Sequence, residues 1–262
     1  MPSVSAVSLA GYLATVTTHG QIQWLSYGLT PNVESLGTQA LGLSETERLV
    51  VSNGQLFSNT GLRWQVEADT TNKPAFVADL TIGGAIKDMK WWQGKLYVAA
   101  DHYGAFSLHN AGNEWQPQNL NAPYSETVQH IDANASGLII AKRDRQIVSA
   151  KATPLAVEKT IVSGIDPLHM AVGQALIAVS DGYRVLIKEN DTQRKAQIET
   201  KLENGVSVTA MVWNGDTLWL AGDDGKLHEL FFESWPINTY DVREYTYDIS
   251  LKAPALKLVA EA

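Results

Sequence analysis

The stretch VTAMVWNGDTLWLAGDDGKLHEL, residues 208–230, decides the fold because it combines three short apolar segments with two tight turns. Its first segment alternates apolar residues and ends at the Asn-Gly-Asp turn of residues 214–216. A second apolar segment runs into Asp-Asp-Gly at 223–225, where an Asp-Gly pair tolerates the positive φ of a hairpin turn. Residues 227–230 then alternate again, as a third strand. Short strands separated by turns at even intervals predict an all-β fold of the closed or radial kind.

Related copies of this stretch occur along nearly the whole chain. Leu218 has five counterparts, and the six anchor leucines recur about every 41 residues, at Leu13, Leu56, Leu96, Leu138, Leu176 and Leu218. The second turn also recurs, with Gly20, Gly61, Gly104, Gly182 and Gly225, whereas the fourth copy reads Arg143-Asp144-Arg145-Gln146 without glycine. This period is typical of a four-stranded propeller blade. We therefore predict a single six-bladed β-propeller of four-stranded antiparallel blades over residues 1–262, with 233–262 as an outer and closing strand.

The segments KLYVAADHYGAFSL, residues 95–108, and TLWLAGDDGKLHEL, residues 217–230, resemble blades of WD40-like and two-component-regulator-type propellers. This resemblance covers residues 3–232 and lies at the level of the superfamily. The sequence departs from true WD40 repeats because no Trp-Asp pair ends a third strand and no Gly-His pair opens a repeat. The paired glycines of kelch repeats and the Asp-box of sialidases are also missing. The resemblance implies the fold, and propellers carry many unrelated functions.

The segments between the repeats should supply the outer strand of each blade. We expect outer strands within residues 28–44, 76–82, 155–162 and 242–251, and an exposed strand or short helix within 192–202. Residues 110–124 are expected to form a linker, and residues 255–259 to pair with the first blade and close the ring. Closure is expected because an open ring leaves unpaired strand edges.

Composition excludes several classes of function. The 262 residues carry a net charge of -8 and no cysteine, which excludes thiol nucleophiles and thiolate metal sites. An acidic chain without a basic run argues against a nucleic acid or an anionic membrane as partner. No run approaches the roughly 18 apolar residues of a membrane-spanning helix, and the N-terminus lacks the positive region of a signal peptide. These features leave the compartment open and slightly favour the cytoplasm.

The first strand of each blade should line a central channel. Counting eight and six residues back from each anchor leucine places charged residues on the inner strands of blades two, three and four, namely Arg48, Asp88, Lys90, His130 and Asp132. The other three blades contribute Ser5, Val7, Leu168, Met170, Ala210 and Val212. Residues two apart share a strand face, so these side chains should converge. An error of one residue in this alignment would turn each side chain to the other face.

Two interpretations of the polar set stay open. In the first, His130 and Asp132 transfer protons while Arg48 or Lys90 holds an anion, as in a general acid/base site. In the second, opposite charges from neighbouring blades pair with one another and hold channel waters. No Asp-rich calcium loop or His-x-x-x-His pair occurs, so we predict neither a metal site nor a cofactor.

Two tryptophans are candidate binding residues. Trp115 and Trp235 are expected in connections that follow a third strand, and large aromatic residues on loops are typical binding anchors. Their alternative role is to cap the blade beneath them.

Three functions follow from these features. The first is a non-catalytic binding module or scaffold that presents loops to a protein or glycan partner. The second is a hydrolase or lyase that acts on a small polar substrate at the channel mouth. The third is a structural component of a larger assembly.

Overall fold

The computed structural model describes residues 3–9, 12–17, 21–27, 33–40, 49–52, 55–58, 62–65, 75–79, 86–102, 104–111, 114–119, 127–152, 155–189, 197–232 and 242–247. Within these residues the strands form six four-stranded antiparallel sheets, which we number in chain order. The other regular element described is a 3-10 turn, η1, at Glu203–Gly205. The chain therefore has a propeller-like all-β fold.

Each sheet is a meander whose strands follow one another in sequence. Sheet one holds β1 (Ser3–Leu9), β2 (Tyr12–Thr17), β3 (Gln21–Tyr27) and β4 (Val33–Ala40), and sheet two holds β5 (Leu49–Ser52), β6 (Gln55–Ser58), β7 (Leu62–Gln65) and β8 (Ala75–Asp79). Sheet three holds β9 (Asp88–Trp92), β10 (Lys95–Ala99), β11 (Ala105–Ala111) and β12 (Glu114–Asn119), and sheet four holds β13 (Val128–Asn134), β14 (Gly137–Lys142), β15 (Gln146–Ala152) and β16 (Leu155–Ser163). Sheet five holds β17 (His169–Val172), β18 (Leu176–Ser180), β19 (Val185–Glu189) and β20 (Gln197–Thr200), and sheet six holds β21 (Val208–Asn214), β22 (Thr217–Gly222), β23 (Leu227–Phe232) and β24 (Val242–Tyr247).

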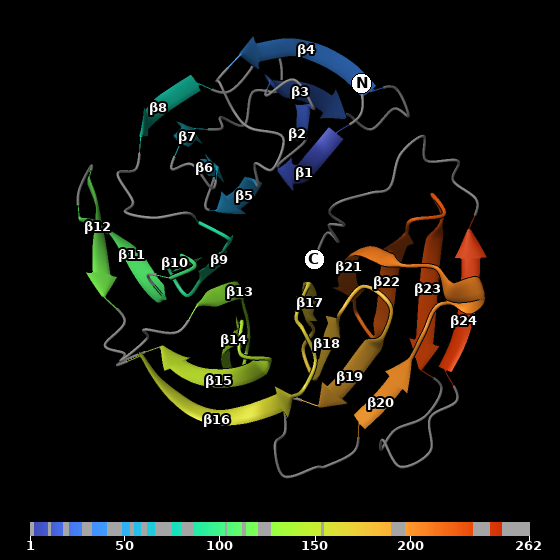
Figure 1. Ribbon diagram of the computed structural model, residues 1–262. Helices are drawn as coiled ribbons and strands as arrows, with labels where there is room; N and C mark the ends of the chain where they lie inside the picture. The colour runs from blue at the N-terminus through green and yellow to red at the C-terminus, as the bar shows by residue number, and fades with distance from the viewer. Residues whose placement is uncertain are drawn as a thin grey trace.

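The first strand of each sheet lies innermost, and the fourth lies at the periphery (Figure 1). Contacts between inner strands link consecutive sheets, from β1 to β5, β9, β13, β17 and β21. Among the described residues, β21 and β1 do not pack against each other as the inner strands of consecutive sheets do. Five successive interfaces thus join the six sheets.

The core lies between the sheets because each strand alternates its side chains between two faces. Leu138 and Ile140 of sheet four share a hydrophobic cluster with Tyr97 of sheet three. On the opposite face of sheet four, Ile139 shares a second cluster with Ile177 of sheet five. Both faces of sheet four are therefore apolar at its second strand, which explains the apolar run of residues 138–141 in β14, whose residues are all buried.

Among the described side chains, four anchor leucines belong to hydrophobic clusters, namely Leu96, Leu138, Leu176 and Leu218. Leu96, Leu138 and Leu218 are fully buried, as expected from the repeat. Trp213 of sheet six also donates its indole N–H to the Ala171 carbonyl of sheet five, at 3.1 Å. A Cβ at Gly173 would lie 3.0 Å from the Trp213 ring, so the absence of a side chain there permits this packing.

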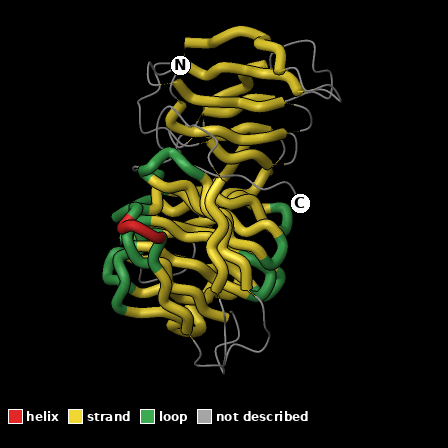
Figure 2. Tube along the Cα trace, turned by 90° about the vertical axis from the view of Figure 1, so that its right-hand side faces the viewer, coloured by secondary structure: helices red, strands yellow, loops and turns green. Residues whose placement is uncertain are grey.

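Turns lie on two opposite faces of the molecule, with the strands running between them (Figure 2). The face that carries the connections between second and third strands also carries η1, and we call it the turn face. Gly104, Gly182 and Gly225 adopt positive φ there, as their positions in the repeat predict. In sheet four, which lacks the glycine, Arg145 adopts a φ of 67° and fills the same role.

Hydrogen bonds across the turn face join neighbouring sheets. The Asp101 carbonyl accepts the Val128 N–H at 3.0 Å, and the Gly182 carbonyl accepts the Val208 N–H at 2.6 Å. In each case the turn between the second and third strands of one sheet accepts a hydrogen bond from the first strand of the next sheet. The repeated turn therefore stabilises the contact between sheets as well as its own hairpin.

Several sequence predictions can be compared with the strands. The expected outer strands correspond to β4, β8, β16 and β24, and the polar segment 192–202 contains the outer strand β20. Residues 110–124 were expected to be a linker, which was wrong for 110–111 and 114–119, because these residues form the end of β11 and the whole of β12. The proposed closing segment 255–259 lies outside the described residues.

Candidate functional site at the inner strands

The inner strands of sheets three and four bring four of the predicted polar residues together. Asp88 and Lys90 lie on β9, and His130 and Asp132 lie on β13. Strand register supports the alignment of the two hairpins, because Lys90 pairs with Tyr97 and Asp132 pairs with Ile139, each the residue after an anchor leucine. The fifth predicted member, Arg48, lies outside the described residues.

The four side chains form two pairs across the interface. Lys90 Nζ lies 2.6 Å from Asp132 Oδ1, and His130 Nδ1 lies 3.4 Å from Asp88 Oδ2. Lys90 and Asp132 thus bring opposite charges together between sheets three and four. Of the four residues, His130 is nearly buried, whereas Lys90 keeps 38% of its side chain exposed.

Both carboxylates also bind backbone N–H groups of two adjacent sheets. Asp88 accepts the Met89 N–H at 3.0 Å and the Ile131 N–H of sheet four at 3.2 Å. Asp132 accepts the Ala133 N–H at 2.8 Å and the Val172 N–H of sheet five at 3.3 Å. Each aspartate thus connects its own inner strand to the next one. Backbone N–H groups left without an acceptor in such a position cost free energy.

Burial raises the pKa of the Asp132 carboxyl, while the Lys90 ammonium and the Ala133 N–H act in the opposite direction. Ionising Asp132 in the folded protein therefore costs free energy. Its oxygen atoms accept hydrogen bonds from the inner strands of sheets four and five. The oxygen atoms that a proton-transfer role would require are already bound to Lys90, Ala133 and Val172.

In sheet five, the inner residues are not the ones found by counting back from the anchor leucine Leu176. In sheets four and six the anchor face packs toward the preceding sheet, as Leu138 and Leu218 show. In sheet five it is Ile177 that faces sheet four, whereas Leu176 shares a cluster with Leu218 of sheet six. The equivalent of the anchor leucine is therefore Ile177, one residue later.

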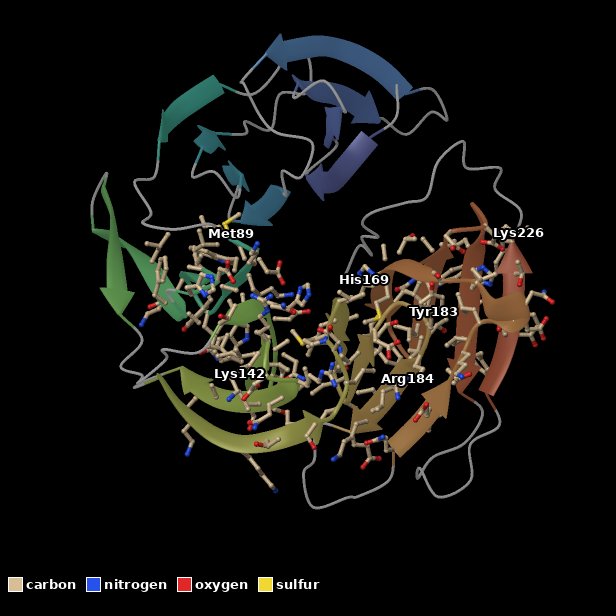
Figure 3. The ribbon with its side chains drawn as sticks, viewed as in Figure 1. Met89, Lys142, His169, Tyr183, Arg184 and Lys226 are labelled. Atoms are coloured by element: carbon tan, nitrogen blue, oxygen red, sulfur yellow. The ribbon has the colours of Figure 1, made fainter. Side chains whose placement is uncertain are left out.

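This shift corrects the inner positions of sheet five. The residues equivalent to His130 and Asp132 are His169 and Ala171, which pair with Ser180 and Ala178, rather than Leu168 and Met170. His169 lies on the innermost strand of its sheet (Figure 3). The polar inner set therefore extends over sheets three, four and five.

A second polar cluster, unnoticed in the sequence, lies in sheet six. His228 is 2% exposed, and its Nδ1 lies 2.7 Å from Glu244 Oε1 while its Nε2 lies 3.2 Å from Asp224 Oδ1. Glu244 accepts the Glu203 N–H of η1 at 3.3 Å. The cluster thus ties β23 to the outer strand β24, to the turn before β23 and to η1. Its only sequence signal is a histidine on an alternating strand, which is also typical of exposed positions.

The ring nitrogens of His228 both face carboxylate oxygens, so both can donate a hydrogen bond only when the ring carries two protons. Burial tends to raise the pKa of Asp224, but hydrogen bonds from His228 and the Lys226 N–H bring this pKa below its ordinary value. A Cβ at Gly222 would lie 2.4 Å from Asp224 Oδ1 and 2.9 Å from His228 Nε2. The cluster therefore needs glycine at this position.

The two tryptophan candidates were not both placed as expected. Trp115 lies within the outer strand β12, opposite Asn110, and not in a connection, because the chain continues its meander there. Trp235 lies outside the described residues. The described part of the chain contains no group of three His, Asp or Glu side chains that could hold a metal ion. None of its helices is long and apolar enough to cross a membrane.

Comparison with known proteins gives the fold but no family. No family model matches the sequence, and no curated protein matches it. One similar solved structure is described as PorZ, an essential bacterial surface component of the type-IX secretion system of Porphyromonas gingivalis. That structure matches 92% of this chain with a TM-score of 0.64 and 15% sequence identity. The match covers 31% of the PorZ chain, so this chain spans about a third of its length.

Proposed function

We propose that the chain forms a closed six-bladed β-propeller that acts as a non-catalytic, protein-binding scaffold within a larger assembly. The observation that carries the proposal is the mutual pairing of the inner polar side chains, in which Lys90 binds Asp132 and His130 binds Asp88. Side chains engaged in this way hold neighbouring sheets together. In this proposal the protein is a rigid disc that binds its partners through the turns between strands.

The six-bladed ring is supported by the last sheet. Trp219, Glu229 and Tyr245 are successive register partners and share one face of sheet six. This face carries the exposed aromatic side chains Phe231, Tyr245 and Tyr247, with Trp219 and Tyr247 rings 5.5 Å apart.

The corresponding face of sheet five is covered by sheet six. Its register partners Ala178 and Ile187 are fully buried and share a cluster with Leu218. By this equivalence, sheet one is the element that covers the aromatic face of sheet six. An uncovered aromatic face of this size is unfavourable in water.

A role in a protein assembly is also supported by the structural similarity. PorZ, which shares this fold over the matched region, is described as a component of a secretion system. A scaffold needs shape and stability instead of a reactive group, and both come from the repeated sheets. We therefore place protein partners before glycans or small substrates.

The proposal is tested by quantitative affinity capture of the tagged chain from the source cells. We expect one or a few proteins at near-stoichiometric amounts, and the same recovery with His130→Ala, because this residue is not assigned a role in binding. Substrate screening of the purified chain accompanies the capture. A turnover that His130→Ala abolishes, without any stoichiometric protein, would reject the scaffold.

A further inference from the structure

The turn face carries a pair of large, exposed apolar side chains. Tyr183 is 63% exposed and Leu168 is 49% exposed. Leu168 precedes β17 and Tyr183 lies in the turn between β18 and β19, and a Cβ at Gly182 would lie 3.6 Å from the Leu168 side chain. The two residues therefore lie at the same end of sheet five.

The turn that presents Tyr183 is held rigidly by its first residue. Asp181 Oδ1 accepts the N–H groups of Tyr183 at 3.1 Å and Arg184 at 2.8 Å, and Oδ2 accepts the Arg184 Nε–H at 2.7 Å. Burial acts against ionisation of Asp181, but these bonds bring its pKa below the ordinary value. The Gly182 carbonyl is in turn bound by Val208 of the next sheet. A preorganised turn loses little conformational entropy on binding, and an exposed Tyr on it resembles the residues that dominate interfaces.

Two basic side chains lie on the same turn face as this apolar pair. Arg143 and Arg145 are exposed in the turn between β14 and β15, and the Arg145 carbonyl accepts the N–H of Gly164, in the segment that leads to Leu168. The carboxylate between the two arginines, Asp144, is engaged by Lys142 at 3.2 Å and by the Gln146 N–H at 3.2 Å.

No carboxylate of the described residues forms an ion pair with Arg143 or Arg145. The exposed Asp166 lies in the segment between Gly164 and Leu168. Two guanidinium groups therefore remain available on the turn face, and Arg is the residue best suited to bind a carboxylate in a fixed geometry.

We propose that Arg143, Arg145, Leu168 and Tyr183 form the docking surface of the scaffold, and that its partner is a protein segment that carries both an apolar side chain and one or more carboxylates. The apolar side chain packs between Leu168 and Tyr183, and the carboxylates bind the two arginines. Charge complementarity selects an acidic segment even though the chain itself carries a net charge of -8. This inference rests on the proposed scaffold function.

The test uses a phage-displayed library of random peptides, panned on the full purified chain. Enriched peptides are synthesised, and their Kd values are measured for the wild type, for the double variant Leu168→Ser/Tyr183→Ser and for Arg143→Gln/Arg145→Gln. The matched control on another surface is Lys95→Gln. Both docking-surface variants should keep the wild-type melting temperature, because the four side chains that they replace are exposed.

We expect enriched peptides that combine Asp or Glu with an aliphatic or aromatic residue, and a loss of at least tenfold in affinity for each docking-surface variant but not for Lys95→Gln. Binding should also weaken with added salt. Peptides without acidic residues, equal binding by all variants, or a preference of the arginine pair for anionic vesicles would each overturn the inference.

Failure of this inference differs from failure of the scaffold proposal. A partner that is captured equally well by the Leu168→Ser/Tyr183→Ser variant overturns the docking surface but leaves the scaffold. Peptide binding without any stoichiometric protein in the capture experiment overturns the scaffold function on which the inference rests.

Discussion

Replacing Asp132 should show whether its charge or its acceptor oxygens hold the inner strands together. Asp132→Ala removes the acceptor of both the Ala133 and the Val172 N–H groups. Each unsatisfied, largely buried N–H costs about 1–3 kcal/mol, so we expect a loss of about 2–4 kcal/mol in the free energy of unfolding, since water reaches part of this site. At this chain length, that loss lowers Tm by roughly 4–12 °C.

Asp132→Asn is the matched control, because it removes the charge but keeps one acceptor oxygen. Burial raises the pKa of Asp132, so the charged form is held at a cost that Asn lacks. The partner Lys90 is 38% exposed and can be solvated without its carboxylate. Replacing a partly buried ion pair by neutral groups is often close to neutral. We therefore expect a change of no more than about 1 kcal/mol.

The assay is urea denaturation followed by the fluorescence of the eight tryptophans. The pH dependence gives a second readout. Because the folded pKa of Asp132 is raised, the folded state holds the proton more strongly than the unfolded state, and stability falls as pH rises through the interval above the ordinary carboxyl value. Asp132→Asn should lose this slope. Equal destabilisation by Asn and Ala would refute the account, because charge would then matter more than the acceptor oxygens.

Two further predictions concern the buried cluster of sheet six. Gly222→Ala should lower the free energy of unfolding by about 1–3 kcal/mol in the same denaturation assay, because the new Cβ overlaps Asp224 and Val206; an unchanged midpoint would contradict the packing. The pKa of Asp224 is lowered in the fold, so its contribution to stability is present above the ordinary carboxyl pKa and is lost as pH falls through the folded value. His228→Gln should flatten this acid-side loss, as measured by thermal melts across pH, and an acid profile equal to that of the wild type would contradict the assignment.

The repeated sheets could be predicted from the sequence because each one is encoded by a short, local pattern. Each hairpin is encoded by an apolar alternation and a turn, and the burial of Leu96, Leu138 and Leu218 followed directly. Turn chemistry was less decisive: the fourth copy lacks glycine, yet Arg145 adopts the positive φ that the turn requires. Hydrogen bonding of Asp144 to the Gln146 N–H supports that turn.

Only part of the candidate site could be predicted from the sequence, because the prediction depends on which residues of a strand face inward. Counting from an anchor residue placed Asp88, Lys90, His130 and Asp132 together, but it missed His169. Sheet five aligns on Ile177, and two adjacent apolar residues cannot be distinguished when both faces of a sheet are buried. Register became clear only from the packing of neighbouring sheets.

The buried cluster around His228 could not be predicted for a different reason. His228 and Glu244 lie on adjacent strands, 16 residues apart in sequence, and their contact depends on the pairing of β23 with β24. Nothing in the local pattern marks these polar residues as buried. Similarly, Trp115 was assigned to a connection because Asn and Pro surround it, although the edge of a sheet tolerates proline.

Closure of the ring is tested most directly by a disulfide between sheets six and one. Asp132 of sheet four binds the Val172 N–H of sheet five, and the equivalent positions in sheets six and one are Val212 and Ser8. The chain has no cysteine of its own, so Val212→Cys/Ser8→Cys introduces a single pair of thiols. Val212→Cys/Val50→Cys, which joins sheet six to the inner strand of sheet two, is the control.

A closed six-bladed propeller predicts that mild oxidation of the dilute Val212→Cys/Ser8→Cys variant consumes both thiols within one molecule and raises its Tm, whereas the control keeps its thiols free. Disulfide formation requires the two Cα atoms to come within about 7 Å, so the reaction reports direct contact of the two inner strands. Free thiols in both variants, or a disulfide only between molecules, would contradict the closed ring.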